Sequence, residues 1–200
     1  MTRIVAGSVG GRTVKVPPKG TRPTSERVRE ALFSRLEHLG CVDGVKVLDV
    51  YAGSGALGFE ALSRGAKSAI FVEKARQAAQ VIILNARNLG FDVQSTVISM
   101  DAERYLAQRE DATLFGGDID LVFLDPPYDV HPGEMTRVLH YLGPWVTPDA
   151  LILIETSTRA PQPQWPDYFD LEDMRTYGET SVWFIGPSPR MAHDNKDKDQ

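Results

Sequence analysis

Residues 45–66 read VKVLDVYAGSGALGFEALSRGA, the pattern of a buried strand, a glycine loop and a helix. The segment 45–50 is rich in valine and leucine, which is typical of a strand in a parallel sheet. Gly53, Gly55 and Gly58 then give the spacing G-x-G-x-x-G. Glycines let the backbone turn tightly and approach a ligand, and a helix N-terminus favours negative charge. The stretch therefore predicts a nucleotide-binding strand–loop–helix unit, although a tight structural turn would give the same spacing.

The strand–helix alternation continues over the next hundred residues. Further strands are expected at 68–73, 92–98, 120–125 and 150–155, and further helices at 74–89, 101–108 and 134–141. Repeated strand–helix units build a doubly wound, mostly parallel sheet, so the fold class is α/β. Residues 168–178 and 179–186 break the alternation and read as two strands joined by a turn at Gly178.

The first 43 residues form a separate N-terminal extension. Ile4 and Val5 precede the turn pair Gly10-Gly11, and apolar and polar residues alternate over 13–16, which predicts a short β-hairpin. Thr24 or Ser25 could cap a helix over about 26–39, which Gly40 would end. We therefore divide the chain into an extension (1–43), a main domain (44–186) and a polar, aperiodic tail (187–200) that we expect to be disordered.

Charge is distributed unevenly along the chain. Residues 1–35 hold eight basic and two acidic side chains, a local balance of +6, whereas residues 36–200 hold 14 basic and 25 acidic side chains, or −11. A basic arm on an acidic body indicates contact with a polyanion at the N-terminal end. A solvated basic face without a partner is the alternative.

Composition narrows the class of protein. No apolar run is long enough to span a bilayer, and the first residues lack the apolar core of a signal peptide. The single cysteine, Cys41, excludes an internal disulfide framework, so we expect a cytoplasmic protein. The four histidines are scattered and fit no zinc spacing. We therefore expect no metal and no membrane association, and a monomer is assumed.

A second motif ends the expected strand 120–125. Residues 118–129 read DIDLVFLDPPYD, in which Pro126 and Pro127 stop the strand because proline has no N–H for the sheet ladder. Ligands of open α/β sheets bind at the carboxyl ends of strands, so this tetrapeptide is expected to face the glycine loop. A rigid turn with a surface tyrosine is the alternative interpretation.

Asp49, Asp101 and the delivery of Asp-Pro-Pro-Tyr to the same sheet edge favour S-adenosylmethionine (SAM) over a dinucleotide, whereas Glu73 suits either cofactor. Asp49, just before the glycine loop, would serve a pyrophosphate poorly but suits the amino group and sulfonium of SAM. Glu73 ends the next expected strand, twenty residues after Gly53, where it can accept hydrogen bonds from ribose hydroxyls. Asp101 could accept from an adenine amino group, cap the helix that follows it, or do both.

The Asp-Pro-Pro-Tyr stretch has the chemistry that methylation of an aromatic amine requires. An exocyclic amino nitrogen is a poor nucleophile because its lone pair is delocalised into the ring. Asp125 and the Pro126 carbonyl can accept its N–H hydrogens and hold it at near-attack distance. The Tyr128 ring can stack on a base that has left its helix.

These motifs together resemble a known family. RIVAGSVGGR (3–12), RPTSERVREALF (22–33), LDVYAGSGALGFEALSRGA (48–66), FVEK (71–74) and FLDPPY (123–128) are similar to the bacterial small-subunit ribosomal RNA guanine-N2 methyltransferases. The resemblance covers about residues 3 to 185. It implies a seven-stranded Rossmann-like sheet, SAM as methyl donor, and one guanine of 16S rRNA in an assembled or assembling small subunit as target.

The resemblance also implies roles for individual residues. SAM would be bound by Asp49, Tyr51, Ala52, Gly53, Gly55, Glu73, Lys74, Asp101 and Ala102. The guanine amino group would be held by Asp125, Pro126, Pro127 and Tyr128, and RNA phosphates would be met by Arg12, Arg22, Arg27 and Arg29. Tyr51 departs from the phenylalanine of many relatives. Pairing of Arg27 and Arg29 with Glu26 or Glu30 along the helix is the alternative for those two arginines.

Other functions remain open from the sequence. The acceptor could be adenine N6, cytosine N4 or a protein glutamine amide, although adenine and glutamine enzymes more often carry asparagine before the two prolines. The chain could also be a non-catalytic RNA-binding assembly factor that retains SAM. A nicotinamide dehydrogenase is the weakest alternative, because it leaves Asp-Pro-Pro-Tyr unexplained.

Overall fold

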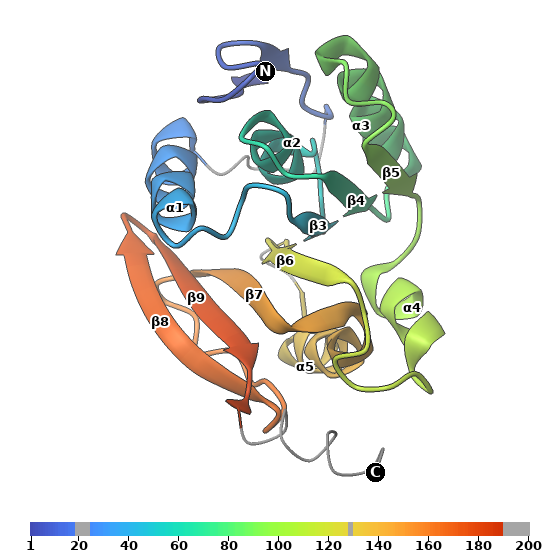
Figure 1. Ribbon diagram of the computed structural model, residues 1–200, viewed down its shortest axis with the longest axis vertical. Coiled ribbons are helices and arrows are strands. Elements are labelled where there is room, and N and C mark those ends of the chain that lie inside the picture. Colours follow the sequence, from blue (N-terminus) through green and yellow to red (C-terminus); the bar gives the residue numbers. More distant parts are fainter. Residues whose placement is uncertain (19–24, 128–129, 190–200) are drawn as a thin grey trace.

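Seven strands form one sheet in the computed structural model, which describes residues 1–18, 25–127 and 130–189 (Figure 1). In chain order they are β3 (Lys46–Val50), β4 (Ser68–Val72), β5 (Ser95–Ile98), β6 (Ile119–Leu124), β7 (Val146–Ser157), β8 (Phe169–Tyr177) and β9 (Thr180–Pro187). Their order across the sheet is β5-β4-β3-β6-β7-β9-β8. Strands β3 to β7 pair in parallel, and β9 is antiparallel to both β7 and β8. The doubly wound, mostly parallel seven-stranded sheet is confirmed.

Helices cover both faces of this sheet (Figure 1). They are α2 (Ala56–Ser63), α3 (Arg76–Leu89), α4 (Ala102–Leu106) and α5 (Pro132–Leu142), with short 3₁₀ turns at Ala107–Arg109 and Gly143–Trp145. Alternate residues of each strand serve the two faces. Leu121 and Phe123 of β6 pack with α2 and α3, whereas Val122 and Leu124 pack with α4 and α5. This alternation also fixes which side chains reach each face at the strand ends.

The N-terminal extension forms the expected hairpin and helix. β1 (Thr2–Arg3) and β2 (Thr13–Val14) are antiparallel, and α1 runs over Glu26–His38. The Ser25 hydroxyl caps α1 by accepting from the Val28 N–H at 3.2 Å. Ile4 and Val14 are buried in the same core as α1 and α2. The extension therefore packs on the α2 side of the sheet rather than standing apart from it.

Several element ends differ from the sequence expectations. β5 begins at Ser95 rather than 92, because Val93 lies in a turn and is 93% exposed. The helix expected at 101–108 ends at Leu106 and tightens into a 3₁₀ turn. The tail does not begin at 187, since β9 includes Pro187 and the Ser188 N–H donates to the Tyr168 carbonyl at 2.8 Å. Residues 190–200 lie outside the described residues.

Membrane-spanning helices and metal-binding clusters are both absent from the residues that the structure describes. No helix within the described ranges is long and apolar enough to cross a membrane. Within the same ranges, no three or more His, Cys, Asp or Glu side chains are grouped so as to hold a metal ion.

Candidate functional site

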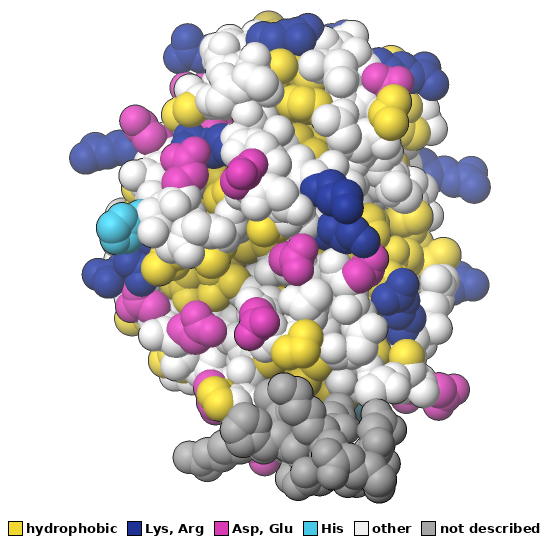
Figure 2. Space-filling model, in the orientation of Figure 1, with side chains coloured by type: hydrophobic (Ala, Val, Ile, Leu, Met, Phe, Trp, Pro, Cys, Tyr) yellow, Lys and Arg dark blue, Asp and Glu magenta, His cyan; other side chains and the backbone are white. Residues whose placement is uncertain are grey.

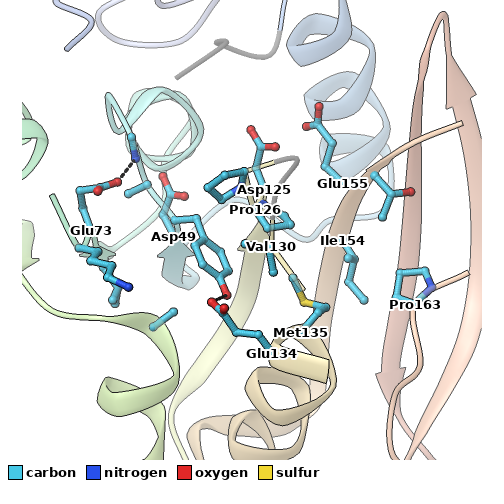
Figure 3. A pocket seen from close by; sticks show the side chains of 18 of the residues that line it. Asp49, Glu73, Asp125, Pro126, Val130, Glu134, Met135, Ile154, Glu155 and Pro163 are labelled. Carbon is cyan, nitrogen blue, oxygen red and sulfur yellow. Dashed lines mark hydrogen bonds between the residues drawn. The ribbon is translucent and has the colours of Figure 1, made fainter. Parts of the chain in front are cut away.

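A cleft of about 1120 Å³ lies at the carboxyl edge of β3, β4, β6 and β7 (Figure 3). It receives the glycine loop after β3, the residues after β4 and β5, and the start of the Asp-Pro-Pro-Tyr stretch after β6. Of the residues expected to bind a cofactor, all except Gly55 line it: Asp49, Tyr51, Ala52, Gly53, Glu73, Lys74, Asp101 and Ala102. The two sequence motifs therefore share one cleft.

The glycine loop is held by backbone geometry that other residues would disturb. Gly55 has φ +79° and begins α2, and a Cβ there would lie 2.6 Å from the Phe59 ring. Gly58 carries no positive φ, but a Cβ on it would lie 2.3 Å from the Phe71 ring. Gly55 itself does not line the cleft, although its neighbours Ser54 and Ala56 do, and its contact with a cofactor stays a prediction.

Asp49 is the buried charge at the base of the loop. Its carboxylate is 1% exposed and accepts from the Gly58 N–H at 3.0 Å. Burial raises the pKa of Asp49 well above its usual range, and the nearby negative charges of Asp125 and Glu73 add to that increase, while the Gly58 hydrogen bond opposes it. Because a nearby positive charge would favour the ionised form of this buried group, Asp49 is well suited to bind a cationic group of a ligand.

Glu73 is oriented by two backbone donors. Its carboxylate oxygens accept from the Gly53 N–H at 2.9 Å, drawn as a dashed line from Glu73 in Figure 3, and from the Ala75 N–H at 2.7 Å. A carboxylate has about four acceptor positions, so these two contacts leave capacity for ligand hydroxyls. The hydrogen bond to Gly53 also ties the end of β4 to the glycine loop.

Asp101 and Lys74 close one side of the cleft. The Asp101 carboxylate caps α4 by accepting from the Arg104 N–H at 3.3 Å and pairs with the Lys74 ammonium at 3.0 Å. Partial burial disfavours its charged form, but the Lys74 hydrogen bond and the backbone donors outweigh this and lower the pKa of Asp101. The expected N-cap is confirmed. Contact with an adenine amino group stays a prediction.

The Asp-Pro-Pro-Tyr stretch begins directly after β6. Asp125 and Pro126 are half-buried and Pro127 is exposed, and all three line the cleft. Tyr128 lies outside the described residues. β6 is the neighbour of β3, so the last strand pair before the two motifs is Val50 with Leu124. The adjacent strand ends explain why the glycine loop and Asp125 meet at one place.

Tyr51 adopts a left-handed backbone conformation with φ 62° and reaches across the cleft. Its hydroxyl donates to a Glu134 carboxylate oxygen at 3.4 Å (Figure 3). Burial raises the pKa of the Tyr51 hydroxyl, and the Glu134 charge adds to the effect, so the phenol stays a donor. The hydroxyl that distinguishes Tyr51 from phenylalanine thus contacts a side chain of α5.

Comparison with known proteins identifies the family. Residues 2–186 match the family described as Conserved hypothetical protein 95. The ribosomal RNA small subunit methyltransferase D of Haemophilus influenzae is 38% identical over 161 residues, which cover 80% of each chain. The protein of that name from Escherichia coli K12 is 35% identical over 180 residues, 90% of this chain and 86% of the relative. The chain belongs to this family.

A solved structure agrees with this membership. The putative methyltransferase yhhF from Escherichia coli superposes with a TM-score of 0.79 at 31% identity, covering 94% of this chain and 98% of that one. In this methyltransferase family member, the cleft at the sheet edge is therefore the candidate active site.

The prediction that Arg29 meets RNA phosphates is wrong. Arg29 is 0% exposed, donates to the Thr2 hydroxyl at 3.1 Å and to the Arg3 carbonyl, and lies 4.0 Å from the buried Glu60 carboxylate. It joins α1 to the hairpin and to α2, so it does not meet RNA phosphates. Glu26, one of the helical partners weighed for the arginines, forms its ion pair with Arg3 at 3.2 Å, and its charge also acts on Arg29.

The other arginines differ in how accessible they are. Arg27 is exposed on α1. Arg12 is exposed but its guanidinium donates to the Leu89 and Asn88 carbonyls at the end of α3. Arg22 lies outside the described residues. RNA contact by Arg12, Arg22 and Arg27 stays a prediction.

Cleft residues that the sequence motifs did not reveal come from α5, β7 and the segment after it. They include Glu134, Met135, Ile154, Glu155 and the segment 160–164. Of these, only Glu155 could have been placed in the cleft from the sequence. It ends the expected strand 150–155, which would run parallel to the strand that ends at Asp125. The others depend on where α5 and the segment after β7 lie in space.

Asn85 links the glycine loop to the hairpin segment. This α3 side chain is 1% exposed; its amide nitrogen donates to the Ser54 carbonyl at 3.1 Å and to the Lys15 carbonyl at 2.9 Å, and its oxygen accepts from the Lys15 N–H at 2.9 Å. One amide therefore fixes both segments.

Replacing Asn85 with alanine is expected to weaken cofactor binding. Loss of the amide leaves the buried Ser54 carbonyl and the part-buried Lys15 backbone groups unpaired, at a stability cost of about 1–3 kcal/mol. Because Ser54 lies in the cleft, we expect roughly tenfold weaker SAM binding, or about 1.4 kcal/mol, by titration calorimetry. Ser63→Ala is the control, since the Ser63 hydroxyl holds only the hairpin residues Ala6 and Val9. Equal weakening in both variants would refute a specific role for Asn85 in the loop.

Proposed function

We propose that this protein transfers a methyl group from SAM to the exocyclic N2 amino group of a guanine in small-subunit 16S ribosomal RNA. The observation that carries the proposal is the meeting of two motifs in one cleft. The glycine loop with buried Asp49 follows β3, and Asp125-Pro126-Pro127 follows the neighbouring strand β6. A donor site and an acceptor site on adjacent strand ends are what a direct transfer requires.

The residues of the cleft fit SAM better than a dinucleotide. When bound, SAM supplies an electrophilic methyl group on a sulfonium centre. Asp49 would face the cationic amino-acid end, Glu73 the ribose hydroxyls, and Asp101 with Ala102 the adenine. The Asp49 carboxylate is poorly placed for a pyrophosphate, because in its ionised form it would add like charge there, and burial makes that ionised form costly without a cationic partner. This carboxylate also disfavours a nicotinamide dehydrogenase.

The acceptor amine is proposed to be held by Asp125 and the Pro126 carbonyl. Both accept hydrogen bonds from the amino N–H groups, which favours the tetrahedral nitrogen that develops as its lone pair forms the new N–C bond in line with the breaking S–C bond. The methylated nitrogen then carries one surplus proton, which Asp125 can take at a carboxylate oxygen. Tyr128 would stack on the base.

The proposed RNA substrate rests on the names of the relatives and on the distribution of charge. Two relatives are named ribosomal RNA small subunit methyltransferases, and the basic arm belongs to the hairpin and α1. Figure 2 shows lysine and arginine side chains around the upper end of the molecule, where Figure 1 places the hairpin and α3. RNA phosphates would be met on this surface.

Arg27→Glu is expected to weaken RNA binding and to make it less dependent on salt. Each lost phosphate contact lowers the slope of log affinity against log salt by roughly 0.7–0.9. Filter binding of 16S rRNA over a range of salt concentrations measures the slope. Lys67→Glu, a charge reversal at an exposed residue just before β4 and outside the basic arm, serves as control. An unchanged slope for Arg27→Glu would place the RNA on another surface.

The direct test of the proposed function is label transfer. Radiolabelled SAM would be incubated with small subunits and with naked 16S rRNA, both prepared from cells lacking the enzyme. The proposal expects label in RNA, and the comparison of the two substrates shows whether assembly is required. Label in protein would indicate a glutamine acceptor. Bound SAM without transfer would indicate a binding factor.

A further inference from the structure

Two carboxylates occupy matching positions at the ends of neighbouring strands. The last paired residues of β6 and β7 are Leu124 and Ile154, and the strands are parallel. Asp125 and Glu155 follow this pair directly, so their backbones continue at the spacing of adjacent strands, about 4.8 Å. This register places a second acid beside the proposed catalytic one.

Both side chains extend to the same face of the sheet. Phe123 and Leu153, two residues earlier on each strand, belong to the core on the α1 and α2 side, and side chains two apart on a strand share a face. Asp125 and Glu155 also line one small hollow together with Leu32 of α1, and both line the large cleft. Figure 3 shows the two carboxylates directed the same way, toward α1.

The position of Glu155 is fixed by its backbone. β7 continues through Glu155, which pairs with Val182 of β9, so the residue lies inside a regular strand rather than in a loop. Side chains carried by strands are positioned more tightly than side chains carried by loops. Glu155 can therefore take part in recognition as well as filling space.

We propose that Glu155 accepts the ring N1–H of the target guanine while Asp125 accepts an N2–H of the same edge. The inference rests on the proposed function and names the residue that selects the base. Ionised carboxylates only accept hydrogen bonds. Guanine is the RNA base that presents a ring N–H next to an exocyclic amino group. In adenine and cytosine the ring nitrogen beside the amino group is an acceptor.

The two adjacent acceptors, Asp125 and Glu155, thus pair with both donors of guanine but not with the ring nitrogen of adenine or cytosine. An adenine or cytosine placed here would hold a ring lone pair against the Glu155 carboxylate, with neither group hydrogen-bonded. Sites built to pair a particular hydrogen-bonding group reject analogues that lack it by large factors, because a buried polar group is left unpaired. Asp125 serves the reaction, and Glu155 serves the choice of base.

The experiment compares two bases at the target position. Small subunits are reconstituted with 16S rRNA carrying either guanosine or 2-aminopurine riboside at the modified site. 2-Aminopurine keeps the 2-amino group but lacks the N1–H. The wild-type protein is expected to prefer guanosine by about 100-fold or more in kcat/KM. Glu155→Gln is expected to reduce this preference to about tenfold or less, because an amide can accept from guanine N1–H or donate to the N1 of 2-aminopurine.

The controls separate specificity from general damage. Glu134→Gln alters another carboxylate of the cleft, on the α5 side, and is expected to keep the wild-type preference whatever its overall rate. Glu155→Ala provides a second variant if the glutamine protein does not fold. In Glu155→Ala, the rate of methylation of guanosine should fall toward the rate of methylation of 2-aminopurine riboside.

The possible outcomes are distinct. An unchanged preference in Glu155→Gln, or an equal loss on both bases, would overturn the role of Glu155 while leaving the proposed function intact. If the wild-type protein forms no N2-methylguanosine, the proposed function itself fails and the inference fails with it. A preference reduced in Glu155→Gln but not in Glu134→Gln supports the inference.

Discussion

Asp125→Ala is expected to lower kcat by about 10²–10⁴-fold, the range for loss of a positioned acid–base group, with SAM affinity unchanged. The carboxylate follows β6 and lines the cleft, where it would accept an amino hydrogen and then the surplus proton. The neighbouring Pro126 cannot replace it as a proton acceptor, since it offers only a backbone carbonyl. Single-turnover rates with saturating substrate measure the chemical step.

SAM affinity of the same variant provides the control. Titration calorimetry without RNA should give the wild-type dissociation constant, because Asp125 is assigned to the acceptor. An equal loss of SAM affinity and turnover would instead place Asp125 on the cofactor. Asp125→Asn refines the test, since an amide oxygen still accepts from the amine but takes no proton.

Asp49→Asn is expected to have the second largest effect, on SAM binding. Truncating one partner of a buried charge pair costs about 2–5 kcal/mol, and asparagine keeps an oxygen to accept from Gly58. We therefore expect SAM affinity to fall by roughly 30-fold or more, with little change in thermal stability. Wild-type affinity in this variant would mean that Asp49 only shapes the glycine loop.

Asp49 also gives SAM binding a pH dependence with a definite sign. Burial raises the pKa of this carboxyl group in the free protein, and a bound cation would lower it again. Below the raised pKa, SAM binding therefore releases a proton, and affinity rises with pH by up to about tenfold per unit. For folding of the free protein the sign is reversed, since ionising Asp49 reduces stability as pH rises from the unfolded to the folded pKa.

Calorimetry in buffers of different ionisation enthalpy measures that proton release. Asp125 and Glu73 carry neighbouring charges, so the Asp49→Asn variant is needed to assign the effect. Proton release should disappear in Asp49→Asn. Release that persists in the variant would assign it to another group.

The fold and the centre of the site follow from local sequence patterns. The glycine spacing after 45–50 and the two prolines after 120–125 mark strand ends, and parallel strands bring such ends to one edge. That reasoning predicted Asp49, Glu73 and Asp125 in one cleft, as the structure places them. Ser25 and Gly178 likewise marked a helix start and a turn correctly.

Local sequence patterns could not predict the contacts between segments that are distant in the sequence. Arg29 shares the buried face of α1 with Leu32 and Leu36, but the groups that it meets there, from the hairpin and from Glu60 of α2, lie in segments distant in the sequence. The Asn85 contacts join three segments that share no sequence signal. Each depends on tertiary packing.

Identification of the product nucleoside shows directly whether the protein methylates the N2 amino group of guanine. Small-subunit RNA methylated by the protein is digested to nucleosides and separated by liquid chromatography with mass spectrometry. With the wild-type protein we expect a single new product, N2-methylguanosine, which is absent with Asp125→Ala. N6-methyladenosine or N4-methylcytidine in its place would keep the cleft and its donor site but contradict the guanine assignment.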